Sequence, residues 1–243
     1  MVKEQRETAA AGVGARTIAA VYTGRGLDEQ VAAAARDILP GVRLTSIIDD
    51  SIIFDINSGG GLTPETVRRM LRYYANAADS GASVILNTCS SVGEVVTLGQ
   101  PTVPVPIIRI DEPMAAEAVA RFDRVGVLAT LPSTLHPTRR LLTEKAAAGN
   151  RAVRVTAVVA EGAYAALAAG DGATHDRLVT EAVGRLGREV DGIVLAQASM
   201  ARIADRLTES ARVPVLTSLR SGLAAARAEL DRLGGPTREK DAS

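Results

Sequence analysis

Residues 84–91, VILNTCSS, return in similar form at residues 193–200 as IVLAQASM. Each stretch is a short apolar run that ends in small and polar residues, as a buried strand does when it runs into a loop. The surroundings repeat too: VPIIRI at 105–110 parallels VPVLTS at 213–218, and AAVYTG at 19–24 parallels VGVLATL at 125–131. The chain therefore contains an internal repeat.

The spacings support the repeat and define its equivalent positions. Cys89 lies 17 residues before Pro106, and Gln197 lies 17 residues before Pro214. Thr23 precedes Cys89 by 66 residues, and Thr130 precedes Gln197 by 67. Cys89 and Gln197 are therefore expected to occupy the same place in two similar halves.

Short Val- and Ile-rich runs alternate with longer stretches of helical period along the whole chain, which is typical of α/β folds with parallel sheets. We expect two similar Rossmann/flavodoxin-like lobes, related by a pseudo-twofold axis, over residues 16–122 and 123–233, with flexible termini at 1–15 and 234–243. Strands are predicted at 17–22, 42–48, 83–87, 106–110, 125–129, 153–159, 192–196 and 214–217. Helices are predicted at 28–39, 64–78, 112–121, 138–147, 175–190, 200–210 and 222–233.

The fold class predicts where a ligand binds. In open parallel sheets, ligands bind beyond the carboxyl ends of the strands. Thr23, Cys89, Thr130 and Gln197 all follow predicted strands, and a pseudo-twofold axis would bring the two sets face to face. We therefore predict a site in the cleft between the lobes.

Cys89 is the only cysteine of the chain. Most single cysteines are buried and inert, because the thiol packs as a small apolar group. Here it lies at a strand-to-helix turn among Thr88, Ser90 and Ser91, whose hydroxyl groups are hydrogen-bonding partners and not core neighbours. We interpret Cys89 as a catalytic thiol, since the pKa of a thiol can be brought near working pH for proton transfer.

With these motifs, the chain resembles the aspartate/glutamate racemase superfamily, which includes hydantoin racemases, maleate isomerases and arylmalonate decarboxylases. The resemblance extends from about Thr17 to Leu233 and rests on VYTG, NTCSS, IRIDEPMA, GVLATLPSTLHPT and LAQASM in this order. It implies an isomerase that works without a cofactor and moves a proton at the carbon next to a carboxylate. It also implies a carboxylate cradle made of Asn87, Thr88, Ser90, Ser91, Thr130, Ser133, Thr134, Ala198 and Ser199.

Gln197 departs from the family pattern, because a two-base racemase of this kind has a second cysteine there. An amide cannot relay a proton as a thiol does. Either another group faces Cys89, or the reaction needs one proton on one face, as in a single-cysteine decarboxylase or other lyase. A third alternative is a carboxylate-binding protein without turnover.

Few side chains qualify as a second base. His136 is expected in the first turn of a helix beyond Thr130, where a solvated histidine is the slightly favoured interpretation, and His175 is expected to be exposed. Asp49 and Asp50 end a predicted strand that faces the cleft, so they are candidates for substrate binding or for a base. Glu94 is expected on the surface.

Other functions find less support in the sequence. NSGGG at 57–61 lacks the Lys-Ser/Thr of a phosphate loop and is interpreted as a flexible lid. TGRGLDE at 23–29 has Glu29 where a dinucleotide fingerprint needs its third glycine. One cysteine and two distant histidines indicate no metal site. We therefore expect neither a metal nor another cofactor.

Composition limits the partners. Lys+Arg and Asp+Glu are equal at 28, and only four Tyr and two Phe are aromatic, so a nucleic acid is not expected. No apolar run is long enough to span a bilayer. A single cysteine and an N-terminus without a signal-peptide core favour the cytoplasm. Alanine-rich helices would allow close packing between subunits, so a homo-oligomer is an expectation from composition.

Overall fold

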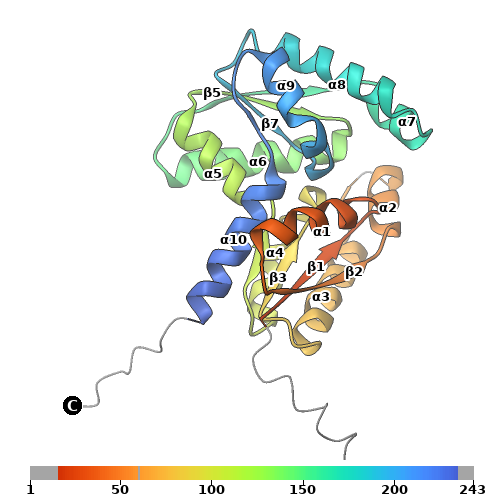
Figure 1. Cartoon of the computed structure of the whole chain (residues 1–243), viewed down its shortest axis with the longest axis vertical. Coiled ribbons are helices and arrows are strands. Elements are labelled where there is room, and N and C mark those ends of the chain that lie inside the picture. Colours follow the sequence, from red (N-terminus) through yellow and green to blue (C-terminus); the bar gives the residue numbers. More distant parts are fainter. Residues whose placement is uncertain (1–15, 60, 235–243) are drawn as a thin grey trace, which may run out of the picture.

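A computed structural model describes residues 16–59 and 61–234, and it shows two α/β lobes (Figure 1). The termini predicted to be flexible lie outside these residues except for Gly234, and so does Gly60 of the predicted lid. Each lobe has a four-stranded sheet in which all neighbouring strands are parallel. The predicted fold class is confirmed.

The two sheets have the same strand order, β2-β1-β3-β4 in the first lobe and β6-β5-β7-β8 in the second. The strands of the first sheet are β1 (Thr17–Tyr22), β2 (Arg43–Ile48), β3 (Val84–Asn87) and β4 (Ile107–Arg109). Those of the second are β5 (Arg124–Ala129), β6 (Arg154–Val159), β7 (Gly192–Leu195) and β8 (Val215–Leu216). In both lobes the strand order reverses beside the first strand, which is where ligands bind in such sheets.

Hydrogen bonds at the strand ends show that equivalent residues pair in the same register in the two lobes. The Thr88 N–H donates to the Val21 carbonyl at 3.1 Å, and the Ala196 N–H donates to the Leu128 carbonyl at 2.8 Å. At β4 and β8, Ile85 pairs with Ile107 as Ile193 pairs with Val215. Cys89 and Gln197 follow these strands at equivalent positions.

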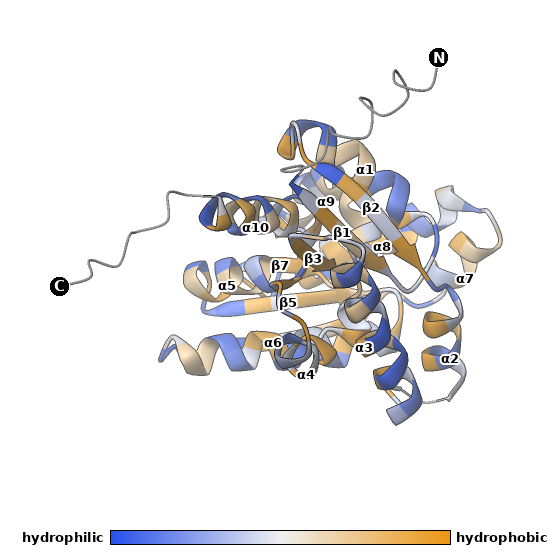
Figure 2. Ribbon diagram, turned by 90° about the horizontal axis from the view of Figure 1, so that it is seen from below, coloured by the Kyte–Doolittle hydropathy of each residue, from blue (hydrophilic) through white to orange (hydrophobic). Residues whose placement is uncertain are grey.

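Apolar residues cover both faces of each sheet, as parallel sheets require. All of β1 is buried: Ile18, Ala20 and Tyr22 belong to one apolar cluster, and Ala19 and Val21 belong to another on the opposite face. Figure 2 shows hydrophobic residues on the helix sides turned toward the strands and polar residues on the outer sides. The local sequence pattern and the packing therefore agree.

The helices follow the strands in chain order and are mostly where the sequence predicts them. They are α1 (Leu27–Ile38), α2 (Ser51–Gly59), α3 (Pro64–Asp79), α4 (Val95–Gly99), α5 (Glu112–Arg121), α6 (Pro132–Ala148), α7 (Ala163–Ala168), α8 (Gly172–Leu186), α9 (Ala204–Ala211) and α10 (Ser218–Leu233). The prediction missed α2 and α7. It also began α6 after Pro137, whereas the helix continues through this proline.

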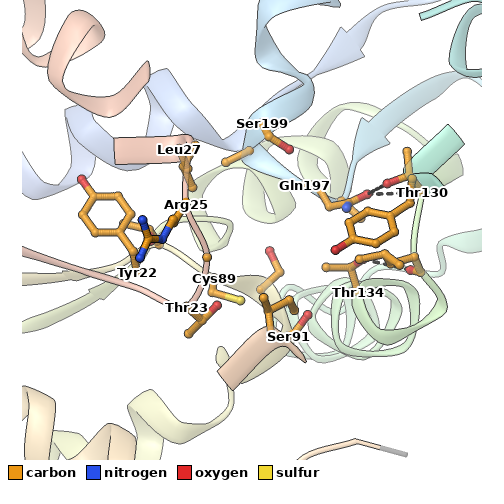
Figure 3. A pocket seen from close by; sticks show the side chains of 18 of the residues that line it. Tyr22, Thr23, Arg25, Leu27, Cys89, Ser91, Thr130, Thr134, Gln197 and Ser199 are labelled. Carbon is orange, nitrogen blue, oxygen red and sulfur yellow. Dashed lines mark hydrogen bonds between the residues drawn. The ribbon is translucent and has the colours of Figure 1, made fainter. Parts of the chain in front are cut away.

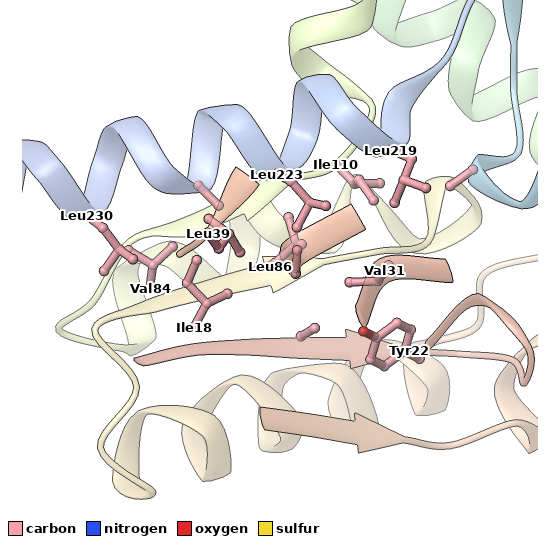
Figure 4. Close-up of a cluster of buried hydrophobic side chains, with 14 residues drawn as sticks. Ile18, Tyr22, Val31, Leu39, Val84, Leu86, Ile110, Leu219, Leu223 and Leu230 are labelled. Carbon is pink, nitrogen blue, oxygen red and sulfur yellow. The ribbon is translucent and has the colours of Figure 1, made fainter. Parts of the chain in front are cut away.

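The last helix of each half packs on the other lobe. Met114 and Ala118 of α5 lie in the cluster of the second sheet, and Leu223 and Leu230 of α10 lie in the cluster of the first (Figure 4). The close approach requires a glycine, because a Cβ on Gly222 would lie 2.6 Å from the Ile110 carbonyl oxygen. A cut near residues 122–124 thus separates the sheets but not the helices that cover them.

Candidate active site

The carboxyl ends of the central strands meet in a pocket of about 250 Å³ between the lobes. Thr23 follows β1, Cys89 follows β3, and Thr130 and Gln197 follow β5 and β7. Figure 3 shows Cys89 near Thr23 and Ser91, with Gln197 and Thr130 beyond them. The pocket is lined by Tyr22, Thr23, Gly24, Arg25, Leu27, Ile53, Thr88, Cys89, Ser90, Ser91, Thr130, Leu131, Thr134, Tyr164, Leu167, His175, Ala196, Gln197, Ala198 and Ser199.

Cys89 is partly buried at the turn between β3 and the 3₁₀ turn η2 (Ser90–Val92). Burial raises the pKa of its thiol above its usual value, and the Thr23 hydroxyl and the backbone N–H groups of Ser91 and Val92 offset only part of this increase. The loop is held by Asn87, whose Nδ2 donates to the Cys89 carbonyl at 3.1 Å and whose Oδ1 accepts from the Tyr74 hydroxyl at 3.2 Å. The thiol is therefore fixed in position, with donors directed at the sulfur.

The hydroxyl groups around the thiol differ in whether they already have a hydrogen-bond partner. Thr88 Oγ1 donates to the Val21 carbonyl at 2.8 Å, and Thr134 Oγ1 donates to the Leu131 carbonyl at 2.9 Å, so both already serve the backbone. The Ser91 hydroxyl is buried and makes no hydrogen bond of ordinary geometry with the described residues. It lies beside the Cys89 sulfur, where it also lowers the pKa of the thiol.

Gln197 occupies the position equivalent to Cys89 as a fixed amide. Its Oε1 accepts from the Thr130 N–H at 2.7 Å and from the Thr130 hydroxyl at 2.9 Å. A backbone N–H needs an acceptor, so the carbonyl end of the amide must face Thr130. The Nε2 group makes no hydrogen bond with the described residues and remains a donor for a ligand.

Asp49 and Asp50, predicted to face the cleft, do not line this pocket. The Asp49 carboxylate accepts hydrogen bonds from Tyr73, Ser51 and Arg69, and Asp50 pairs with Arg25. Burial acts in the opposite direction, but these hydrogen bonds hold the pKa of Asp49 below its usual value. A carboxylate with its lone pairs occupied in this way is a structural anchor and not a free base.

Ser133, His136 and Asn87 also lie outside the pocket that Cys89 lines. His136 is exposed on α6 and lines an adjoining hollow together with Ser133. Ser133 Oγ donates to Asn57 Oδ1 at 2.7 Å, which joins α6 of the second lobe to α2 of the first. A second contact between the lobes is the ion pair of Glu94 with Arg140, at 2.7 Å. The structure thus places Ser133, His136 and Glu94 outside the pocket of the thiol, whereas Asn87 supports the Cys89 loop from the end of β3.

His175 is buried and lines the pocket, whereas the sequence led us to expect it exposed. It lies in the first turn of α8, one side of which packs into the core through Val179, Ala182 and Leu186. The spacing of these residues puts His175 on the same helix face. That periodicity was the available signal, but GDG at 170–172 suggested a surface turn.

The remaining wall is apolar, and the two helices that the sequence analysis missed provide part of it. Ile53 comes from α2, and Tyr164 and Leu167 come from α7. Among the described residues that line the pocket, none is Asp or Glu, and Arg25 and His175 are the only basic side chains. The pocket therefore offers hydrogen-bond donors and an apolar wall, but no carboxylate.

Two further features bear on the site and its setting. The described residues contain no group of three or more His, Cys, Asp or Glu side chains arranged to hold a metal ion. None of the described helices combines the length and the apolar character needed to cross a membrane.

Solved structures share this architecture. The chain is similar to allantoin racemase from Klebsiella pneumoniae at 23% identity, with a TM-score of 0.68 over 90% of this chain and 89% of the other. For glutamate racemase isoform RacE1 from Bacillus anthracis, the identity is 16% and the TM-score 0.72, over 90% and 83% of the two chains. Unliganded arylmalonate decarboxylase gives 14% identity and a TM-score of 0.54, over 91% and 94%. At these identities the likeness concerns the fold.

The sequence comparison reaches the family. No curated protein matches the chain. The sequence model of the family described as Asp/Glu/hydantoin racemase, however, matches residues 22–226, which include both halves of the repeat and every residue that lines the pocket. The chain therefore belongs to the Asp/Glu/hydantoin racemase family.

Proposed function

We propose that this protein is a cofactor-independent isomerase of the racemase type, in which Cys89 moves a proton at the carbon next to a carboxylate. The observation that carries the proposal is the position of the thiol. It lies in the pocket where the central strands end, beside Thr23 and Ser91, and faces the second lobe. A thiol among donors at this point is suited to proton transfer and is a poor apolar core residue.

The chemistry requires a proton acceptor and donors for the charge that develops. The Cys89 thiolate removes the proton from the α-carbon, and the electron pair of the broken C–H bond moves onto the carboxylate oxygens as an enediolate. The Gln197 Nε2 group makes no hydrogen bond with the described residues, and together with the Ser91 hydroxyl beside the sulfur it would stabilise this dianion. Reprotonation of the carbon completes the turnover.

The lining of the pocket also favours a kind of substrate. An α-ammonium group would be desolvated without a counter-ion, because none of the described residues that line the pocket is Asp or Glu. An apolar substituent would instead contact Ile53, Tyr164 and Leu167. We therefore propose a small carboxylate that bears an apolar substituent and no ammonium group.

A lyase is the second candidate, and Gln197 favours it. An amide at the position equivalent to Cys89 donates hydrogen bonds but transfers no proton. If a carbon–carboxyl bond breaks and leaves the enediolate, Cys89 alone could protonate it once, as a decarboxylation requires.

The test is proton NMR in D₂O with wild-type protein and Cys89→Ala. The panel contains alanine and glutamate as amino acids, lactate and mandelate as hydroxy acids, 2-phenylpropionate, and phenylmalonate. Cys89-dependent loss of an α-proton signal without a new product supports the isomerase. Release of CO₂ with deuterium in the product supports the lyase instead.

The panel also separates a third function, carboxylate binding without turnover. A binding protein would show a higher melting temperature with these compounds and leave all of them unchanged. Exchange that persists in Cys89→Ala would contradict the proposed role of the thiol.

A further inference from the structure

We propose that His175 is the second acid/base group of the site and acts from the lobe opposite Cys89. This inference rests on the proposed function and supplies the group that Gln197 cannot provide. It assigns the two faces of the α-carbon to two different kinds of side chain, a thiol and an imidazole.

The position of His175 is the first observation. The residue is 2% exposed, and yet it lines the same pocket of about 250 Å³ as Cys89. Cys89 comes from the first lobe and His175 from α8 of the second. In a pocket of this size, one small substrate can contact both side chains.

The orientation of the ring is the second observation. His175 Nδ1 lies 2.8 Å from Asp176 Oδ1. Burial raises the pKa of Asp176, but hydrogen bonds from Arg202, His175 and Arg206 lower it well below its usual value. The carboxylate can only accept, so Nδ1 carries the proton, and Nε2 is the nitrogen available for substrate.

Arg202 competes for the same ring nitrogen but does not change this assignment. Its Nη2 lies 3.2 Å from His175 Nδ1, and a guanidinium can only donate. Arg202 also binds both oxygens of Asp176, so its donors already have a carboxylate partner. The shorter contact, from Nδ1 to Asp176, therefore decides the tautomer.

A purely structural role would use only one of the two ring nitrogens of His175. Arg202 and Arg206 tie Asp176 to η4 (Ala198–Ile203) and to α9 without help from the imidazole. His175 uses Nδ1 in this network, whereas Nε2 makes no hydrogen bond with the described residues. The network orients the ring and leaves one nitrogen free.

The interconversion of two enantiomers conserves the number of protons in the site. From one enantiomer, the Cys89 thiolate takes the α-proton, and the imidazolium Nε2–H donates a proton to the opposite face of the enediolate. The products are the other enantiomer, a thiol and a neutral imidazole. The reverse reaction starts from this thiol and imidazole, so the net charge of the site is unchanged.

The two-base arrangement is tested with His175→Asn, whose amide can still donate to Asp176 but has no group in place of Nε2. The substrates are the separate enantiomers of mandelate and of 2-phenylpropionate in D₂O. We expect racemisation to fall about 10²-fold or more, while the enantiomer whose α-hydrogen faces Cys89 still exchanges it. His136→Asn is the matched control, since His136 is exposed and outside the pocket, and it should behave as wild type.

A second measurement needs no substrate. The pH profile of Cys89 alkylation by iodoacetamide should contain a step from the imidazole, because two titrating groups that border one small pocket shift one another's titration. The charged groups around the imidazole are Asp176, which contacts its Nδ1, Arg202 and Arg206, which form ion pairs with Asp176, and Arg25, which lines the same pocket. The step should vanish in His175→Asn and persist in His136→Asn.

The outcomes separate this inference from the proposed function. If wild-type protein racemises either probe and His175→Asn does so at the same rate, His175 is not the second base. If wild-type protein turns over neither probe, the substrate class is wrong for these compounds, and the alkylation profile decides: superimposable profiles for wild type and His175→Asn would overturn the inference.

Discussion

The loops after β3 and β7 have the same backbone course but supply different chemistry. In the first lobe, Asn87 binds the Cys89 carbonyl and is itself bound by the Tyr74 hydroxyl. The thiol of Cys89 therefore takes no part in holding the loop and lines the pocket. In the second lobe, Gln197 is itself the brace, because its Oε1 accepts from Thr130 twice. The comparison teaches that duplicated strand ends preserve a place for a side chain and not its role.

The largest effect is expected from Cys89→Ser, which keeps a hydrogen-bond donor and removes the thiol. A serine hydroxyl is too weakly acidic to serve as a base near neutral pH, so turnover should fall by about 10²–10⁴-fold. The measurement is α-proton exchange by NMR, with the melting temperature as a folding control. Activity within a few-fold of wild type would show that the first loop, like the second, contributes only hydrogen bonds.

Gln197→Glu sharpens the comparison from the other lobe. The new carboxylate still accepts from Thr130, but it replaces the free Nε2 donor with a negative charge in the pocket. Repulsion should weaken the binding of a carboxylate substrate about 10-fold or more, with little change in folding stability. Titration calorimetry with a ligand from the panel measures this. An unchanged Kd would mean that the Gln197 side chain does not approach the carboxylate.

Helices α5 and α10 each pack on the sheet of the other lobe, and the contribution of this packing to stability can be tested at α10. A Cβ on Gly222 of α10 would meet the backbone of Ile110 at 2.6 Å, so Gly222→Ala should destabilise the protein by about 1–3 kcal/mol. Gly184→Ala in α8 is the matched control, because its Cβ would make an ordinary contact of 3.6 Å with Ser210 O. That variant should be neutral or up to about 1 kcal/mol more stable. Urea unfolding of both variants decides between these expectations.

The smallest effect concerns the ends of β1 and β5, where Tyr22 and Ala129 are equivalent. Burial raises the pKa of Tyr22 to about 12, and its hydroxyl makes no hydrogen bond of ordinary geometry with the described residues. The unfolded chain releases this proton near pH 10, so the stabilising effect of the neutral phenol is present below pH 10 and is lost between pH 10 and 12.

Tyr22→Phe should therefore flatten the decline of stability above pH 10 and change stability at neutral pH by no more than about 1 kcal/mol. Chemical unfolding at pH 7 and at pH 10.5 measures both effects. An equal decline in the two proteins would place the alkaline loss elsewhere, for instance at the buried phenol of Tyr74, whose pKa is also raised by burial.

The strands, the duplication and the equivalence of Cys89 with Gln197 could all be predicted from the amino-acid sequence. These follow from local patterns: apolar runs specify buried strands, and parallel pairing then gathers their carboxyl ends at one edge. For the same reason, Thr23 and Thr130 could be assigned to the pocket before any tertiary contact was known.

Which polar side chains remain available at that edge depends on the tertiary contacts. Asp49, in the turn after β2, accepts hydrogen bonds from Arg69 and Tyr73 of α3. His175 is buried because α8 turns that face inward against the second sheet. The partners of a charged group and the exposure of a histidine depend on contacts between distant segments, and no local pattern contains them. The exchange of α5 and α10 between the lobes has the same origin, because an apolar helix face does not specify which of two similar sheets it will cover.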